Sequence, residues 1–142
     1  EFAGAAGGLM DNLGYPYCRG RIFETLEEDK GQYDDETEIF WASGCCFFIR
    51  RKDFWQVGGF DERFFMYMED VDLSRRCASK FGNVYYPLAK VTHLHERASH
   101  KNINLLKAHL KSAFQYFNKW GWFYDSERNI LNRNCLKQFS EY

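Results

Sequence analysis

The sequence predicts an α/β fold in which helices flank a small mixed sheet. Residues 69–81 and 103–119 repeat apolar side chains at helical spacing, whereas residues 41–51 and 83–96 form short apolar runs typical of extended chain. The hydrophobic period changes at the boundaries between these segments. This change of period is the main basis of the fold prediction.

The N-terminal part of the chain is expected to be largely irregular. Residues 1–36 are rich in glycine and acidic side chains and have no sustained hydrophobic period, which favours loops. The stretch WASGCCFFIRR, residues 41–51, is a short apolar run bounded by Gly44 and paired arginines, and it predicts a buried strand. The following KDFWQV suits a short helix that ends at Gly58 and Gly59.

A helix is predicted over residues 69–81, directly after the apolar run FFMYM, and Gly82 stands where a C-cap residue is expected. Its apolar residues at helical spacing are Leu73, Cys77, Ala78 and Phe81. Three acids, Glu69, Asp70 and Asp72, fall in its first turn. The exposed N–H groups and the helix dipole stabilise anions there and are expected to keep the carboxylates ionised at neutral pH.

The three acids permit more than one interpretation. Acidic residues are favoured in the first turn of any helix. Three carboxylates within four residues, however, repel one another unless a cation or a proton-sharing partner lies between them. An ionised carboxylate on a rigid helix is also what a general base requires, and carboxylate oxygens suit a hard divalent ion. The residues alone leave these alternatives open.

An extended segment is predicted over NVYYPLAKVTHLHE, residues 83–96, with Pro87 indicating an edge or an irregularity. In a strand, His93 and His95 would share one face. Two histidines at this spacing can share a metal ion such as Mn²⁺, Fe²⁺ or Zn²⁺. The alternative is that both are surface or hydrogen-bonded histidines.

The C-terminal part is predicted to be helical, with one helix over residues 103–119 and a second around SERNILNRNCLKQF. The apolar stripe of the first consists of Leu106, Leu110, Ala113, Phe114 and Phe117. Such a stripe needs one partner surface, which is either the domain itself or a membrane. The stretch WGW, residues 120–122, is a packing anchor at the helix end, a platform for stacking carbohydrate, or an anchor at a membrane interface.

Composition excludes several classes of protein. The net charge is −1, so no field that attracts nucleic acid is expected. Five cysteines without a C-x-x-C pair predict reduced thiols in a cytosolic protein, not a disulfide framework or a zinc site. No apolar run approaches the roughly 18 residues that span a membrane. Because position 1 is not Met, we expect the chain to be a piece of a longer protein.

The order of the segments resembles the C-terminal half of glycosyltransferase family 2, a large family of inverting enzymes with the GT-A fold. The resemblance rests on the block GGFDERFFMYMEDVDLSRR followed by YYPLAKVTHLH, and it covers residues 38–100 well. FNKWGW is similar to the tail of bacterial members that build surface polysaccharides. The resemblance implies a partial GT-A fold over residues 1–100 and a helical C-terminal extension over residues 101–142.

The resemblance also implies roles for particular residues. Asp70 would be the catalytic base that removes the proton from the acceptor hydroxyl, and Glu69 would help to orient the acceptor. His93 would complete a Mn²⁺ or Mg²⁺ site beside the donor diphosphate in the intact enzyme. The residues expected to bind donor or acceptor are Trp41, Gly44 and Arg97. The family's nucleotide-binding units are not found in this sequence, and its one D-x-D, at residues 70–72, belongs to the later motif and not to the family's metal motif. The isolated chain is therefore expected to be inactive.

The function predicted in this way is transfer of a sugar, with inversion, from a nucleotide diphosphate sugar to a hydroxyl of a growing or lipid-linked glycan. The expected location is the cytoplasm, with peripheral contact to the inner face of the cell membrane. The alternative is a non-catalytic module that binds a glycan or a protein partner through an aromatic groove. A D-x-D motif upstream in a full-length parent would distinguish the two.

Overall fold

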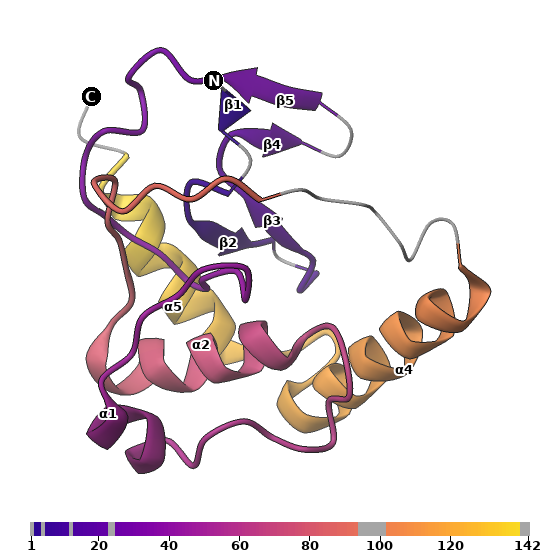
Figure 1. The fold of residues 1–142 in the computed structure, drawn as a ribbon. Coiled ribbons are helices and arrows are strands. Elements are labelled where there is room, and N and C mark those ends of the chain that lie inside the picture. Colours follow the sequence, from indigo (N-terminus) through magenta and orange to yellow (C-terminus); the bar gives the residue numbers. More distant parts are fainter. Residues whose placement is uncertain (1, 4, 12, 23–24, 94–101, 140–142) are drawn as a thin grey trace.

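The structure is a computed structural model that describes residues 2–3, 5–11, 13–22, 25–93 and 102–139. It is a mixed α/β arrangement of short strands and helices, as expected. In Figure 1 the strands gather in the upper part of the molecule, whereas α1 (Arg51–Gln56), α2 (Glu69–Phe81) and α4 (Ile103–Trp120) lie below them. Helix α5 (Ser126–Lys137) runs beside β2 and β6 and joins the two parts.

The strands form three small sheets. They are β1 (Phe2–Ala3), β2 (Gly8–Met10), β3 (Pro16–Cys18), β4 (Arg21–Ile22), β5 (Thr25–Glu28), β6 (Thr37–Glu38) and β7 (Val84–Tyr85). The sheet orders are β1-β5-β4, β2-β3 and β6-β7. Each pairing between described strands is antiparallel, so these sheets are not mixed, contrary to the sequence prediction.

Two predictions for the N-terminal part are wrong. Residues 1–36 were expected to form loops but carry five short strands, whose glycines allow the tight turns between them. Residues 41–51 were expected to form a buried strand, yet only Trp41 forms a β-bridge, to Gly8. After Trp41 this stretch pairs with no described strand, and the N–H groups of Ala42 and Gly44 bond instead to Ser74 and Asp70 of α2.

The predicted helices are confirmed. Helix α1 ends before Gly58 and Gly59, and α2 ends at Gly82, whose φ of +80° favours glycine. Helix α4 is capped by Asn102, and α5 is capped by Asp125, which accepts the Arg128 N–H at 2.9 Å. None of the described helices is both long and apolar enough to cross a membrane.

The extended segment predicted over residues 83–96 is confirmed only at its start. Strand β7 pairs with β6, so that Thr37 faces Tyr85 and Glu38 faces Val84. From Pro87 to His93 the chain forms no strand. Residues 94–101, which include His95, lie outside the described part of the chain.

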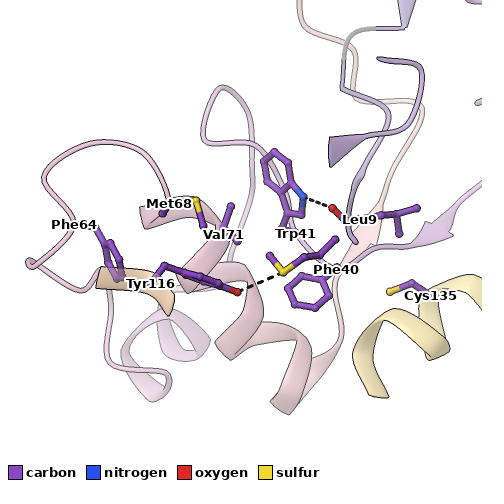
Figure 2. Close-up of a cluster of buried hydrophobic side chains, with 9 residues drawn as sticks. Leu9, Phe40, Trp41, Phe64, Met68, Val71, Tyr116 and Cys135 are labelled. Carbon is purple, nitrogen blue, oxygen red and sulfur yellow. Dashed lines mark hydrogen bonds between the residues drawn. The ribbon is translucent and has the colours of Figure 1, made fainter. Parts of the chain in front are cut away.

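One buried apolar cluster connects the strands to α2, α4 and α5 (Figure 2). Its members are Leu9, Met10, Phe40, Trp41, Phe64, Met68, Val71, Tyr116 and Cys135. Tyr116 is fully buried, and its hydroxyl donates to the Met10 sulfur at 3.7 Å. The cluster contains residues from the predicted domain, residues 1–100, and from the predicted C-terminal extension, residues 101–142. The division between these two parts stays a prediction.

Candidate active site

The chain enters α2 through an unusual backbone conformation. Tyr67 and Met68 have φ values of +66° and +65°, a left-handed region that side chains other than glycine seldom occupy. Helix α4 holds this segment in place, because the Ser112 hydroxyl donates to the Met66 carbonyl at 2.7 Å and the His109 ring stacks on Tyr67 at 4.6 Å. Backbone strain of this kind is concentrated at functional sites. Here it sets the direction in which α2 begins.

Asp70 is held by two backbone donors at the start of α2. Its Oδ2 accepts the N–H of Gly44 at 2.8 Å, and its Oδ1 accepts the N–H of Val71 at 2.8 Å. A Cβ added at Gly44 would lie 3.4 Å from Oδ2, so the loop backbone approaches the carboxylate closely. Two of the predicted site residues, Asp70 and Gly44, are therefore brought together.

The pKa of Asp70 is raised above its ordinary value. Burial of the half-buried carboxylate is the largest cause, and the hydrogen bonds from Gly44 and Val71 only partly offset it. Desolvation thus opposes the stabilisation that the helix N-terminus was expected to provide. A higher pKa makes the carboxylate a stronger proton acceptor once it is ionised.

Glu69 lies beside this carboxylate and has an oxygen without a partner. Burial raises the pKa of Glu69, and the charge of Asp70 raises it further. The Oε2 atom is buried and has no hydrogen-bond partner among the residues that the structure describes. A buried carboxylate oxygen in this state can accept a hydrogen bond from a ligand hydroxyl.

Asp72, the third acid, points into the protein. It is fully buried, and its carboxylate accepts hydrogen bonds from Arg76 Nε at 2.9 Å and from Trp120 Nε1 at 2.7 Å. Lys119 Nζ lies 2.7 Å from Asp72 Oδ1, the oxygen that also accepts from Trp120, and it contacts Asp61 at 2.8 Å. These contacts make Asp72 a structural residue that joins α2 to the end of α4.

A second buried ion pair fixes α2 against the start of α5. The guanidinium of Arg75, 1% exposed, donates twice to Asp125 at 2.6 Å and also contacts Glu127. Its plane lies over the Trp120 ring, 4.2 Å from the ring centre. Together with Asp72, this pair makes α2 a rigid support for Asp70.

The remaining predicted site residues are not brought to Asp70 in the same way. Trp41 is 9% exposed and belongs to the core, where its indole N–H donates to the Leu9 carbonyl at 2.9 Å (Figure 2). His93 is exposed. Arg97 lies outside the described residues. Within the described ranges, no three His, Cys, Asp or Glu side chains form a group that could hold a metal ion.

Two residues around Asp70 were not predicted from the sequence. Ser74, one turn along α2, accepts the Ala42 N–H at 3.1 Å and so anchors the loop that carries Gly44. Cys18, at the end of β3, has its pKa raised to about 11 by burial, and the charge of Asp70 adds to the increase. The spacing of Ser74 from Asp70 was a usable signal, whereas nothing in the glycine-rich N-terminal sequence placed Cys18 beside α2.

Comparison with known proteins identifies the class of protein. The profile of the family described as "Glycosyltransferase like family 2" matches residues 2–129, and the chain belongs to this family. This match includes the whole of the site around Asp70.

Two bacterial relatives give functional context. The chain is 40% identical over 111 residues to the N-acetylglucosaminyl-diphospho-decaprenol L-rhamnosyltransferase of Mycobacterium tuberculosis, covering 76% of this chain and 36% of the relative. It is 33% identical over 103 residues to the rhamnosyltransferase WbbL of Escherichia coli K12, covering 70% of this chain and 36% of that relative. The chain thus spans about a third of the length of these curated relatives. No solved structure matches it.

Proposed function

We propose that this chain forms the acceptor side of an inverting glycosyltransferase in which Asp70 is the general base. In the intact enzyme, a sugar would pass from a nucleotide diphosphate sugar to a hydroxyl of a lipid-linked glycan. The proposal draws on the family membership and on the two relatives, both of which are named as rhamnosyltransferases. The observation that carries it is the carboxylate of Asp70, fixed by the N–H groups of Gly44 and Val71.

The proposed step uses this carboxylate directly. Each oxygen of Asp70 accepts one backbone hydrogen bond and keeps a second lone pair for the acceptor hydroxyl. As the acceptor oxygen attacks the anomeric carbon, its proton moves to Asp70, while the bond from that carbon to the diphosphate breaks on the opposite face of the sugar. Attack opposite the leaving group inverts the configuration. The unpartnered oxygen of Glu69 would accept a hydrogen bond from the acceptor and orient it.

Use of Mn²⁺ or Mg²⁺ by the intact enzyme is a further part of the proposal. The metal would neutralise the leaving diphosphate. His93 would supply one ligand, but the described residues offer no group of three suitable ligands. This part of the chain therefore does not fit a complete metal site. Arg97 would contact the donor.

The family membership also supports the broader architecture that we propose. Residues 1–100 would complete a GT-A domain together with a nucleotide-binding half, and residues 101–142 would form a C-terminal extension. The name of the mycobacterial relative contains a decaprenol-linked acceptor, which supports a location at the inner face of the cell membrane for an enzyme of this kind. Helix α4 and the residues after it would provide the membrane contact.

The test is the turnover of a full-length parent enzyme with Asp70 replaced. Asp70→Asn keeps the size of the side chain but removes its basicity, and turnover should fall by about 10²–10⁴-fold. Glu62→Gln, which neutralises an exposed acid nearby in the sequence, should leave turnover unchanged and serves as the control. Retention of more than half the turnover by Asp70→Asn contradicts the assignment.

A non-catalytic glycan-binding module is the second candidate function. Exposed aromatic side chains favour it, because Phe48 is 94% exposed and Trp55 is 65% exposed near the loop that carries Gly44. A full-length parent that transfers no sugar, together with glycan binding that Phe48→Ala and Trp55→Ala abolish, would favour this function over the enzyme.

A further inference from the structure

One surface of the chain is apolar and largely exposed to solvent. It is formed by the outer side of α4 and by the three aromatic residues that follow Gly121, and we name it the outer face. Its members are Ile103, Leu106, Leu110, Phe114, Trp122, Phe123 and Tyr124. Leu110 is 62% exposed, Phe114 57% and Tyr124 98%. Exposed apolar patches of this kind mark interaction sites.

The outer face is exposed because α4 packs through its opposite side. Ser112 and Tyr116 are the fully buried residues of α4, and both turn toward α2 and the core. At 3.6 residues per turn, Leu110 and Phe114 lie on the other side of the helix. In Figure 1 the first turns of α4, in orange, project beyond the other elements. Of the apolar stripe predicted from the sequence, Leu106, Leu110 and Phe114 are exposed, whereas Phe117 packs partly against the core.

Trp122 extends the outer face beyond the end of α4. Its ring stacks on Phe117 at 5.1 Å and meets Phe114 edge-on at 5.3 Å, while its indole N–H donates to Asn118 at 2.9 Å. Trp120 points inward to Asp72, so it is not part of this surface. Of the two tryptophans in WGW, only Trp122 thus has the position of an interfacial anchor.

The segment that forms the outer face carries charges of one sign. Residues 103–124 contain three lysines and no acidic residue, although the whole chain has a net charge of −1. Lys119 is neutralised by Asp61 and Asp72, but Lys107 and Lys111 are exposed beside the apolar stripe. A helix with apolar and aromatic residues on one side and lysines beside them is typical of helices that lie in the interface of anionic membranes.

We propose that the outer face lies on an anionic lipid bilayer, with α4 in the plane of the interface. The inference rests on the proposed function, because a lipid-linked acceptor holds its sugar at the membrane surface. The inner side of α4 contacts Met66 and Tyr67, which Met68 separates from Glu69 and Asp70. An α-helix with its side chains is about 10–12 Å across, so the carboxylates would lie roughly one helix diameter above the lipid.

The test is co-sedimentation of the chain with vesicles of phosphatidylglycerol and phosphatidylcholine, compared with vesicles of phosphatidylcholine alone. The wild type should bind the anionic vesicles, and high salt should weaken the binding. Lys107→Gln/Lys111→Gln should reduce the partition coefficient by about 30-fold, since each lysine near such a surface contributes about 1 kcal/mol. Leu110→Gln/Phe114→Gln should reduce it by at least about 100-fold.

Two controls make the result specific. Phe48→Gln/Leu88→Gln replaces apolar side chains that are just as exposed but lie elsewhere, and it should bind as the wild type does. Asp70→Asn should also bind vesicles normally, because binding requires neither donor nor acceptor. In a full-length parent, Leu110→Gln/Phe114→Gln should still transfer sugar to a water-soluble acceptor. Failure of the membrane inference is thereby distinguished from failure of the proposed function.

Three results would overturn the inference. The first is a folded wild type that does not bind anionic vesicles. The second is equal binding by the Leu110→Gln/Phe114→Gln variant. The third is a reversible dimer in analytical ultracentrifugation that the same variant abolishes, because the outer face would then be an interface between copies of the chain. Circular dichroism and urea unfolding verify that each variant is folded.

Discussion

Asp72→Asn should destabilise the fold strongly, although the substitution changes only one atom. Asp72 is fully buried and neutralises Lys119 and Arg76, with distances of 2.7 and 2.9 Å. Removing one partner of a buried ion pair costs about 3–5 kcal/mol. Lys119 keeps Asp61, and Arg76 keeps the Val57 carbonyl, so we expect a cost near the lower limit, about 3 kcal/mol.

Urea unfolding measures this cost directly. With a slope of roughly 1.5 kcal/mol per molar, a loss of about 3 kcal/mol lowers the midpoint by about 2 M while the slope stays constant. Asp70→Asn is the matched control in the same turn of α2. It removes a half-buried charge whose pKa burial has raised, and the free energy of unfolding should change by less than about 1 kcal/mol.

The opposite order of stability losses in these two variants would refute the prediction. If Asp70→Asn destabilised the chain more than Asp72→Asn, then Asp70 would be the structural acid, and the division of roles within EDVD would be wrong. A loss of less than about 1 kcal/mol in Asp72→Asn would show that the contacts of Lys119 and Arg76 to other groups are sufficient.

Asp125→Ala should cost about 3–5 kcal/mol in urea unfolding because it leaves the buried Arg75 with Glu127 as its one carboxylate contact among the described residues. The double variant Arg75→Met/Asp125→Leu should recover part of the loss, since the N-cap bond from the Arg128 N–H stays missing. A single variant as stable as the double would contradict this. Burial acts to raise the pKa of Asp125, but hydrogen bonds from Arg75 and Arg128 lower it overall. The stability that this pair provides should therefore be present above about pH 4 and be lost as the pH falls further, with a smaller loss in the double variant. Calorimetry of the chain with Mn²⁺ should give weak binding or none; a micromolar affinity that survives His93→Ala would show that other ligands form the site.

The helices could be predicted from the sequence because their signals are local. The period of apolar residues and the glycine at position 82 placed α2 correctly, and α4 was placed in the same way. The strands of residues 1–36 could not be predicted, because each has only two to four residues and is defined by its partner across a turn. A period cannot be recognised in so few residues.

The error at residues 41–51 has a different physical cause. The apolar run CCFFI has the composition of a strand. The N–H groups of Ala42 and Gly44, just before this run, bond to Ser74 and Asp70 on α2. Phe48 remains 94% exposed. Composition could not reveal that side chains of α2, 26 and 32 residues away, would replace a neighbouring strand.

The candidate site was predicted in part. The family resemblance named Asp70 and Gly44 as site residues, and the structure brings them together, while their roles stay predictions. Asp70 bonds to the loop that carries Gly44, whereas Asp72 is buried inside the protein. This difference depends on the direction in which α2 begins, and hence on the left-handed conformation of Tyr67 and Met68. Neither residue type signals that conformation. The buried position of Trp41 likewise follows from its neighbours and not from its own sequence context.

The hydrogen bond from Gly44 to Asp70 comes from the main chain, so the side chains of the loop can vary without loss of this bond. Every amino acid except proline supplies a backbone N–H, so the support of the carboxylate does not depend on the side chains of the loop. The exposed residues that follow, Cys45 to Phe48, are therefore free to change. In a full-length parent with the proposed activity, a library randomised at these four positions should keep the hydrogen bond that supports the Asp70 carboxylate, which makes this loop the natural starting point for redesign of acceptor preference.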